Sequence, residues 1–152
     1  MCIVRGVLDS DIEAIKKIYE QAFNRTEGLI DEYYPKFKEY VDFCVKQKFS
    51  YVALNDDVIC GVLLACEKPD IEWGKVLYIE LLAVLPEFQK KGIGTKLLNK
   101  LREDAVNSNF MELSLRTGCY LDAYQIYKKY GFRDTRSDRR YMILNIGNKQ
   151  GR

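Results

Sequence analysis

Apolar residues in this chain recur at two spacings, and each spacing predicts one kind of element. Spacings of three and four residues, which place apolar side chains on one face of a helix, cover residues 12–23, 33–44, 95–105 and 122–130. Alternating or continuous apolar runs of strand length cover residues 3–8, 49–55, 58–66, 75–84, 110–116, 132–135 and 141–146. The predicted order is β-α-α-β-β-β-α-β-α-β-β. This is a mixed α/β fold with the long apolar strand 75–84 near the centre of its sheet.

Residues at the ends of these elements indicate where they begin and stop. Ser10 and Glu13 stand three positions apart at the start of the first helix and predict a capping box. Gly131 follows the last helix, at a position where a left-handed residue ends many helices. Residues 24–30 and 67–74 are mainly polar and contain glycine, so they are predicted to be loops.

Two glycines follow strand 75–84 at the point where the next helix begins, in the stretch Gln89-Lys90-Lys91-Gly92-Ile93-Gly94. Glycines let a ligand approach the backbone closely, and the first N–H groups of a helix have no partner within it. The helix dipole and the two lysines add positive charge. The stretch is therefore predicted to hold a pyrophosphate. It lacks the Gly-Lys-Ser/Thr of one common phosphate loop, and Leu97 takes the third glycine position of a dinucleotide fingerprint.

This loop and a second segment resemble the GNAT superfamily of N-acetyltransferases. Residues 82–94 read Leu-Ala-Val-Leu-Pro-Glu-Phe-Gln-Lys-Lys-Gly-Ile-Gly, similar to the family's acetyl-CoA signature of an apolar strand followed by Gln/Arg-x-x-Gly-x-Gly/Ala. Residues 123–132 resemble its Ala-x-x-x-Tyr-x-x-x-Gly-Phe segment, in the right order. The resemblance implies a GNAT-type acyl-CoA N-acyltransferase fold, with a mixed central sheet flanked by helices. It would form one domain over residues 1–147, followed by a polar tail over 148–152.

The resemblance also implies a set of residues that bind acetyl-CoA, the expected co-substrate, with no metal. Backbone N–H groups of the loop would hold the pyrophosphate, the Thr95 hydroxyl would bond a phosphate oxygen, and Lys90 or Lys91 would reach the adenosine phosphate. The loop set is Gln89, Lys90, Lys91, Gly92, Ile93, Gly94 and Thr95. On the preceding strand, Leu82, Ala83 and Val84 would contact the pantetheine arm through their backbones, where the strand splays from its neighbour. The Leu82 N–H would face the thioester carbonyl and stabilise the oxyanion.

Two side chains are candidates for acid–base chemistry. The resemblance places Tyr127 where the family tyrosine protonates the departing thiolate, and a purely structural core aromatic is the alternative. Glu80 is the only charged residue between positions 76 and 86, and burial would suit its carboxyl to the role of general base. Tyr78, two residues earlier on the same strand, is the alternative candidate for that role. A structural ion pair between Glu80 and Arg116 is the other alternative.

The sequence contains few indications of where the acceptor amine would bind. Residues that would line an amine-binding cleft are Glu27, Asp31, Glu32, Tyr33 and Tyr34, with a solvent-facing helix as the alternative. Many family members also carry an asparagine that contacts the cofactor three residues before the helix alanine. That position is Tyr120 here, so Cys119, Tyr120 or a backbone group would have to replace the contact.

The resemblance implies an N-acetyltransferase in which a neutral primary amine attacks the acetyl-CoA thioester directly, in a ternary complex. The acceptor would be a small-molecule amine or an amine of a protein or peptide, and a homodimer is left open. Two alternatives also stay open. The donor could be a longer acyl-CoA, or the fold could serve as a CoA-binding sensor or interaction module without turnover.

Composition removes several classes of chemistry. The chain has 152 residues and carries 24 basic and 22 acidic residues, for a net charge of +2. That balance is not the footprint of a nucleic-acid-binding protein. No histidine is present, so a Ser-His or Cys-His nucleophilic pair cannot form within the chain. No apolar run is long enough to span a bilayer and no signal-peptide core is present. The sequence therefore predicts a cytoplasmic protein that binds neither nucleic acid nor membrane.

Overall fold

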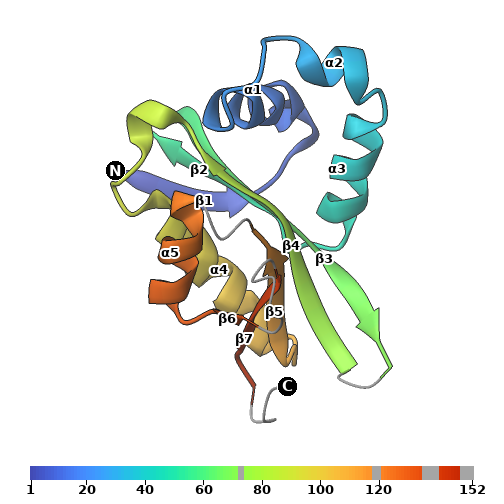
Figure 1. The fold of residues 1–152 in the computed structure, drawn as a ribbon. Helices are drawn as coiled ribbons and strands as arrows, with labels where there is room; N and C mark the ends of the chain where they lie inside the picture. The colour runs from blue at the N-terminus through green and yellow to red at the C-terminus, as the bar shows by residue number, and fades with distance from the viewer. Residues whose placement is uncertain (72–73, 118–120, 135–140, 148–152) are drawn as a thin grey trace. The chain divides into compact units, whose positions relative to one another are not determined.

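The computed structural model describes the chain except for residues 72–73, 118–120, 135–140 and 148–152 (Figure 1). Its helices are α1 Ile12–Ala22, α2 Leu29–Tyr33, α3 Phe37–Lys46, α4 Ile93–Asn107 and α5 Asp122–Tyr130, with short 3₁₀ helices at η1 Asp9–Asp11 and η2 Pro86–Phe88. Its strands are β1 Cys2–Gly6, β2 Tyr51–Asn55, β3 Val58–Asp70, β4 Gly74–Val84, β5 Glu112–Arg116, β6 Arg133–Asp134 and β7 Tyr141–Asn145. Cys119, Tyr120 and the predicted tail lie outside the described residues.

Within the described residues the strands form a seven-stranded sheet in the order β1-β2-β3-β4-β5-β7-β6. β4 pairs with β5 in parallel, whereas β1 with β2, β2 with β3, β5 with β7 and β6 with β7 pair antiparallel. The sheet is therefore mixed, and helices flank it, as predicted (Figure 1). β4 takes the middle place in the strand order, which confirms the prediction that this strand is central.

The chain folds as two compact units, each made of two separate stretches of sequence. The first unit holds Met1–Cys66 and Leu81–Leu101, and the second holds Glu67–Glu80 and Arg102–Arg152. β3, β4 and α4 each contribute residues to both units. The single domain over residues 1–147 stays a prediction.

The first unit has an apolar core drawn from its helices and strands. Side chains spaced three or four positions apart on α1, α3 and α4 are buried together with alternating and consecutive residues of β2 and β3. They are Ile15, Ile18, Val41, Cys44, Val52, Ala53, Cys60, Val62, Leu63, Leu97, Leu98 and Leu101. Fully burying a side chain of the Val, Leu or Ile type contributes about 1.5–3 kcal/mol each.

In the second unit, one face of the sheet is apolar and carries α5. Paired strands place residues of the same register on the same face, which here buries Leu77, Ile79, Leu113, Leu115, Met142 and Leu144. α5 is tied to this face because the Tyr124 hydroxyl donates to Asp134 Oδ2 at 2.6 Å, and Asp134 pairs with Met142 across β6 and β7. Gly131 ends α5 with φ of 119°, which confirms the predicted left-handed stop.

The helix predicted over residues 33–44 begins later than expected, at Phe37, and a separate short helix, α2, starts inside the stretch 24–30 that was predicted to be a loop. α2 ends at Tyr33 and α3 begins at Phe37, with Pro35 between them. Proline has no N–H to donate, and it disfavours helical geometry in the residue before it, so a continuous helix cannot pass this point. None of the helices in the described part of the chain has both the length and the apolar character needed to cross a membrane.

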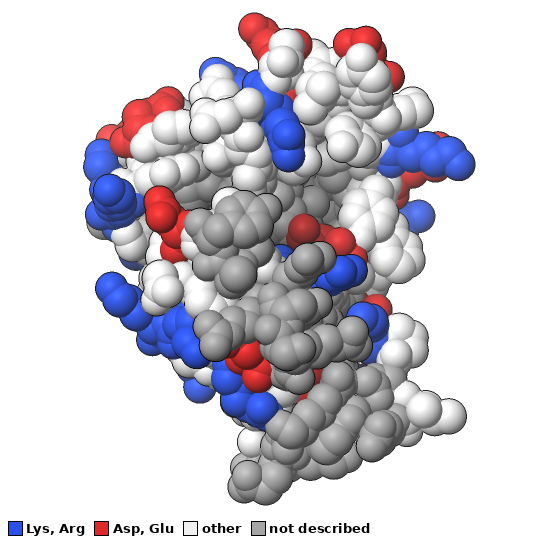
Figure 2. All heavy atoms as spheres, in the orientation of Figure 1, with Lys and Arg blue, Asp and Glu red and all other residues white. Residues whose placement is uncertain are grey.

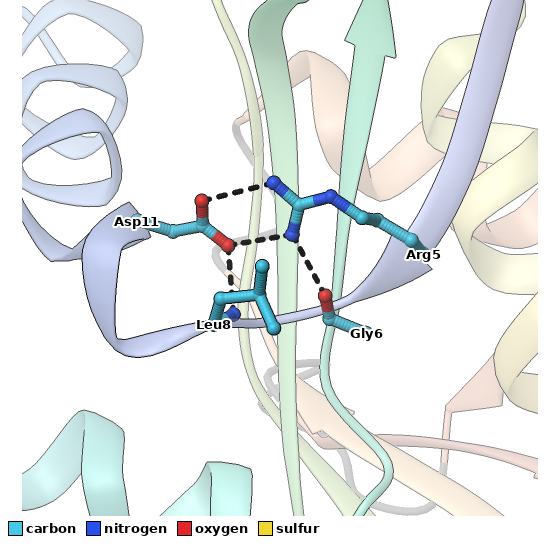
Figure 3. Close-up of polar contacts among 4 residues, drawn as sticks. All are labelled: Arg5, Gly6, Leu8 and Asp11. Carbon is cyan, nitrogen blue, oxygen red and sulfur yellow. Dashed lines mark hydrogen bonds and ion pairs between the residues drawn. The ribbon is translucent and has the colours of Figure 1, made fainter.

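No side chain caps α1 itself, and the capping contact of this region lies one turn earlier, across the 3₁₀ helix η1. The Asp11 carboxylate, not Ser10, makes the capping contact by accepting the Leu8 N–H at 2.7 Å (Figure 3). The same carboxylate accepts two hydrogen bonds from the Arg5 guanidinium, at 2.7 and 3.0 Å, and Asp11 is only 2% exposed. The predicted Ser10–Glu13 capping box is therefore wrong. The ion pair between Arg5 and Asp11 holds the segment that leads from β1 into α1. Ser10 lies within the 3₁₀ helix η1.

The predicted loop over residues 67–74 is also shorter than expected. β3 continues through Glu67 to Asp70, and β4 begins at Gly74, so these two strands form a long hairpin. Polar composition predicted a loop, but pairing along a neighbouring strand satisfies backbone groups whatever the side chains are. Strand formation here depends on the partner strand and not on the local sequence.

Candidate active site

The predicted pyrophosphate loop lies in the first unit, between the end of β4 and the start of α4. The Leu85 N–H donates to the Cys60 carbonyl at 2.8 Å, which fixes the end of β4 to β3. Pro86 then opens the 3₁₀ helix η2, where its missing N–H costs nothing. The helix turns the chain toward the glycines.

Gln89 closes this loop onto the strand. Its side-chain Nε2 donates to the Val84 carbonyl at 2.9 Å, and its backbone N–H donates to the Pro86 carbonyl at 3.2 Å. This N–H already has an acceptor inside the loop, and the contact between Gln89 and a phosphate stays a prediction. Gln89 holds the loop in shape.

The remaining backbone of the loop offers a row of free donors. The N–H groups of Lys91, Gly92, Ile93 and Gly94 have no hydrogen-bond partner among the residues that the structure describes. α4 is α-helical from Ile93, and the Lys96 N–H donates to the Gly92 carbonyl at 3.0 Å. Four donors at the start of a 15-residue helix make an anion-binding cradle.

The space in front of this cradle is open. A Cβ added at Gly92 or at Gly94 would meet no atom within 4 Å. Lys90 and Gly92 both have left-handed backbones, with φ of 62° and 80°. Lys90 and Lys91 are exposed, and Lys and Arg side chains gather over this loop at the left of the view in Figure 2. The loop thus combines open space, free N–H groups and positive charge.

The cradle rests on close packing behind it. A Cβ at Gly61 of β3 would lie 3.1 Å from Ile93 Cγ2 and 3.3 Å from Leu97 Cδ1. These distances are shorter than most contacts of real Cβ atoms, so a larger residue at this position would require the side chains of α4 to shift by a few tenths of an ångström. Of the predicted pantetheine contacts on β4, Ala83 is buried on this side, whereas Leu82 and Val84 are half-buried.

In the second unit, β4 and β5 separate partway along their length. Their parallel pairing joins Val76 to Glu112, Leu77 to Leu113 and Tyr78 to Ser114. β4 continues beyond Tyr78 through Glu80, and β5 continues to Arg116, without a further pair between these described residues. This separation agrees with the splayed strand that the resemblance implies, and it leaves backbone groups of β4 without a β5 partner.

Tyr127 is a buried residue of α5. The residue is 8% exposed, and its ring meets that of Phe132 edge-on at a centroid distance of 5.7 Å. Its hydroxyl makes no hydrogen bond to any described residue. Desolvation by burial raises the pKa of the Tyr127 hydroxyl to about 12, so the group is neutral and able to donate a proton at any pH near 7. The structural and functional interpretations of Tyr127 are compatible.

Glu80 lies on the other face of β4, together with Tyr78. Both side chains are half-buried, and strand alternation directs them to the same side. Lys68 of β3 places its ammonium 5.3 Å from the centre of the Tyr78 ring. Arg116, the alternative partner for Glu80, is exposed at the end of β5. The choice between a base and a structural role for Glu80 stays a prediction.

A further cavity, of about 500 Å³, opens beside α1 in the first unit. Most of its lining residues are charged, and Gln21 and Gly28 complete the lining. The charged residues are Glu13, Lys16, Lys17, Glu20, Arg25, Glu27 and Asp31. Two of the five residues predicted for an amine-binding cleft, Glu27 and Asp31, line it. Tyr33 and Tyr34 are exposed instead. The residues of α1 that line this cavity were not among the predicted site residues, because a charged helix face is usually only solvated.

Known proteins resemble this chain over most of its length. The profile described as "Acetyltransferase (GNAT) family" matches residues 12–132. An N-alpha-acetyltransferase of Sulfolobus acidocaldarius is 30% identical and aligns with 87% of this chain and 80% of its own length. N-alpha-acetyltransferase 30 of Schizosaccharomyces pombe is 33% identical over 88 residues, which span 56% of this chain and 57% of that protein.

Solved structures share the fold at lower identity. Naa50 of Arabidopsis thaliana, in complex with the bisubstrate analogue CoA-Ac-MVNAL, has a TM-score of 0.72 and 23% identity, covering 96% of this chain and 98% of that one. The PaiA N-acetyltransferase of Thermoplasma acidophilum, in complex with coenzyme A, has a TM-score of 0.79 and 18% identity, covering 95% and 99%.

Proposed function

The chain belongs to the GNAT family of acetyltransferases, and we propose that it transfers the acetyl group of acetyl-CoA to the α-amino group of a peptide or protein. The observation that carries this proposal is the cradle of free N–H groups at the start of α4, with open space over Gly92 and Gly94. An α-amino acceptor is supported by the two related N-alpha-acetyltransferases.

Coenzyme A fits the residues present in the loop. Its pyrophosphate would accept hydrogen bonds from the N–H groups of Lys91, Gly92, Ile93 and Gly94, at the positive end of the α4 dipole. The Thr95 hydroxyl and the ammonium groups of Lys90 and Lys91 would reach further phosphate oxygens. The pantetheine arm would pair with the backbone of Leu82, Ala83 and Val84. The Val84 carbonyl already accepts from Gln89, so the arm would use the other groups of this segment.

The proposed reaction is direct attack on the thioester in a ternary complex. The acceptor amine first loses a proton, and Glu80 is the proposed base. The neutral nitrogen then forms a bond to the acetyl carbon while the Leu82 N–H stabilises the negative charge on the carbonyl oxygen. The carbon–sulfur bond breaks, the Tyr127 hydroxyl gives its proton to the departing thiolate, and the nitrogen of the new amide releases its extra proton to solvent. Tyr127 regains a proton from solvent.

The test is an assay of thiol release with acetyl-CoA and a panel of amines. The panel contains peptides with different first residues, the same peptides with blocked N-termini, polyamines and free amino acids. We expect turnover with unblocked peptides and none with blocked ones. Turnover with polyamines or free amino acids alone would overturn the peptide acceptor. Turnover only with a longer acyl-CoA would change the donor, and binding of acetyl-CoA without turnover on any amine would indicate a sensor.

A further inference from the structure

The cavity beside α1 is a feature of the first unit that the proposed reaction does not use. Its volume of about 500 Å³ lies within the range of small-molecule sites, which is about 300–1,000 Å³. Its lining residues lie between Glu13 and Asp31, and none of them belongs to β4 or to the predicted pyrophosphate loop. A ligand in this cavity would therefore contact other residues than acetyl-CoA does.

The face of α1 that lines the cavity is turned away from the core. Ile15 and Ile18 are 0% and 1% exposed, so they direct one face of α1 into the core of the first unit. The lining residues of α1 recur three and four positions apart on the opposite face. They are Glu13, Lys16, Lys17, Glu20 and Gln21. The cavity thus lies on the side of α1 opposite to the apolar core.

Glu20 is a buried carboxylate that lines this cavity and has one oxygen without a partner. The residue is only 8% exposed, and its Oε2 accepts the Ile30 N–H at 3.1 Å. Its other oxygen, Oε1, makes no hydrogen bond to a described residue, yet it is not sealed inside the protein. Burying a carboxylate is costly unless a cation or further donors compensate its charge. Oε1 is therefore an acceptor that is open to a ligand.

The lysine that could neutralise Glu20 is used elsewhere. Lys16 stands one turn before Glu20 on the same face of α1. Its ammonium instead contacts Asp31 of α2 at 2.8 Å and Glu13 at 3.2 Å. Glu20 makes no ion pair with any cation in the described part of the chain. The group that best complements Glu20 Oε1 is therefore the protonated amine of a ligand.

Two unpaired cations line the same cavity. Lys17 and Arg25 are exposed, and neither side chain has a hydrogen bond or an ion pair with another described residue. The Arg25 N–H donates to the Glu20 carbonyl at 2.7 Å, which holds Arg25 beside the end of α1. A guanidinium can bind a carboxylate through two parallel N–H bonds. Glu27 is also exposed and is likewise unpaired among the described residues, so it could accept a further donor.

We propose that this cavity is a second ligand site, which binds a free α-amino acid with a polar side chain. The ammonium group of the ligand donates to Glu20 Oε1, and its carboxylate accepts from Arg25 and Lys17. A polar side chain fits because no aliphatic or aromatic residue of the described chain lines the cavity. This inference goes beyond the proposed function and does not rest on it, because the site shares no residue with the acetyl transfer.

The test is calorimetry of the full chain with L-serine, L-glutamine and L-arginine. We expect at least one of them to bind with a Kd below about 1 mM, and saturating acetyl-CoA should not prevent this binding. Analogues of the bound amino acid that lack one of its two α-charges should bind about 10-fold more weakly or less. For glutamine these are 4-aminobutanamide, without the carboxylate, and N-acetyl-L-glutamine, without the ammonium. No binding by any of the three amino acids, equal binding by either analogue, or competition by acetyl-CoA would overturn the proposal.

Two variants locate the site, each with a control that removes the same sign of charge. Glu20→Gln keeps an oxygen for the Ile30 N–H but removes the negative charge, and Arg25→Gln removes the guanidinium from an exposed position. Each should weaken binding of the amino acid about 10-fold or more. Glu39→Gln and Lys46→Gln, at exposed positions of α3 outside the cavity, should leave the Kd unchanged.

The exposed variant keeps the test decisive if the buried one unfolds. Arg25→Gln changes a side chain that has no partner among the described residues, so its Tm should equal that of the wild type. If Glu20→Gln lowers Tm too far for calorimetry, Arg25→Gln alone decides. Wild-type affinity for the amino acid in a folded Arg25→Gln protein, or in a folded Glu20→Gln protein, would place the ligand elsewhere and overturn the proposal.

Discussion

At the scale of the residue, Tyr127 shows how one side chain serves both the core and the proposed chemistry. Its ring packs against Phe132, and its hydroxyl is bonded to no described residue. Burial makes ionisation of this hydroxyl costly, which is why its pKa rises to about 12. A group that donates a proton to a thiolate must be protonated beforehand, and burial ensures this.

We expect Tyr127→Phe to lower kcat about 100-fold, the low end for acid–base groups, because solvent can also protonate a thiolate. The ring remains, so Tm and the Kd for acetyl-CoA should not change. In the wild type, Tyr127 should cause no fall in rate between pH 7 and 10, because a pKa of about 12 keeps the hydroxyl neutral throughout. Steady-state kinetics across this range provide the measurement. A Phe variant with wild-type kcat would leave Tyr127 a core residue only.

The Arg5–Asp11 pair gives a second prediction at this scale. We expect Asp11→Ala to lower the free energy of unfolding by about 1–3 kcal/mol, because it leaves the Leu8 N–H and part of the Arg5 guanidinium without their carboxylate partner. Asp42→Ala is the control. It removes an exposed i,i+4 pair with Lys38 and should lower the free energy of unfolding much less. Denaturant titration measures both, and equal losses would contradict the argument.

The same pair makes stability depend on pH. Burial alone would raise the pKa of Asp11, but the hydrogen bond from Arg5, the Leu8 N–H and the Arg5 charge together lower it below its ordinary value of 3.8. The pKa of Asp11 is lower in the folded state than in the unfolded state. Its contribution to stability is therefore fully present above the unfolded pKa of 3.8 and is lost as pH falls through the folded pKa. Asp11→Ala should therefore weaken the pH dependence of stability below about pH 4.

At the scale of the element, the strand, loop and helix from β4 to α4 act together. Gln89 and the Leu85 N–H fix the loop to β3 and β4, and Gly61 lets α4 pack closely behind it. These contacts hold the free N–H groups in one place before any ligand binds. Preorganised donors lose less conformational entropy on binding, which is how a short loop can bind a large anionic cofactor.

We expect Gly94→Val to abolish binding of acetyl-CoA while the protein stays folded. The new side chain meets no protein atom within 4 Å, so it would stand in the space open to the ligand. Gly92→Val should also block binding, but with a loss of stability, because φ at Gly92 is 80° and a β-branched residue is strained there. Calorimetry with acetyl-CoA and thermal denaturation separate these effects. Normal binding by a folded Gly94→Val protein would place the pyrophosphate elsewhere.

At the scale of the whole molecule, ligand binding and folding are linked. Acetyl-CoA at about 100 times its Kd should stabilise the folded protein by about 2.7 kcal/mol. For a chain of this size, that is a rise in Tm of roughly 5–10 °C. NAD and ATP should raise Tm much less, because the rest of the predicted site is specific for the pantetheine arm. An unchanged Tm with acetyl-CoA, or an equal rise with NAD, would contradict the cofactor assignment.

Short-range patterns in the sequence determined most of the elements and the position of the cofactor loop. The two glycines after β4 and the left-handed stop at Gly131 depend on backbone conformations that few other residues adopt, so the sequence alone identifies them. The late start of α3 was equally local. Pro35 was sufficient to predict that no helix passes this point, and the apolar periodicity of the residues around it obscured this.

Only the tertiary structure decided which polar groups are already paired. Gln89 belongs to the predicted motif, yet its N–H is bonded inside the loop, and Asp11 rather than Ser10 caps the chain before α1 because Arg5 reaches it from β1. The buried hydroxyl of Ser114 has no partner among the described residues, and the register that pairs Ser114 with Tyr78 is not contained in the sequence of one strand. Hydrogen bonding and burial are properties of neighbours in space, and the folded chain alone selects those neighbours.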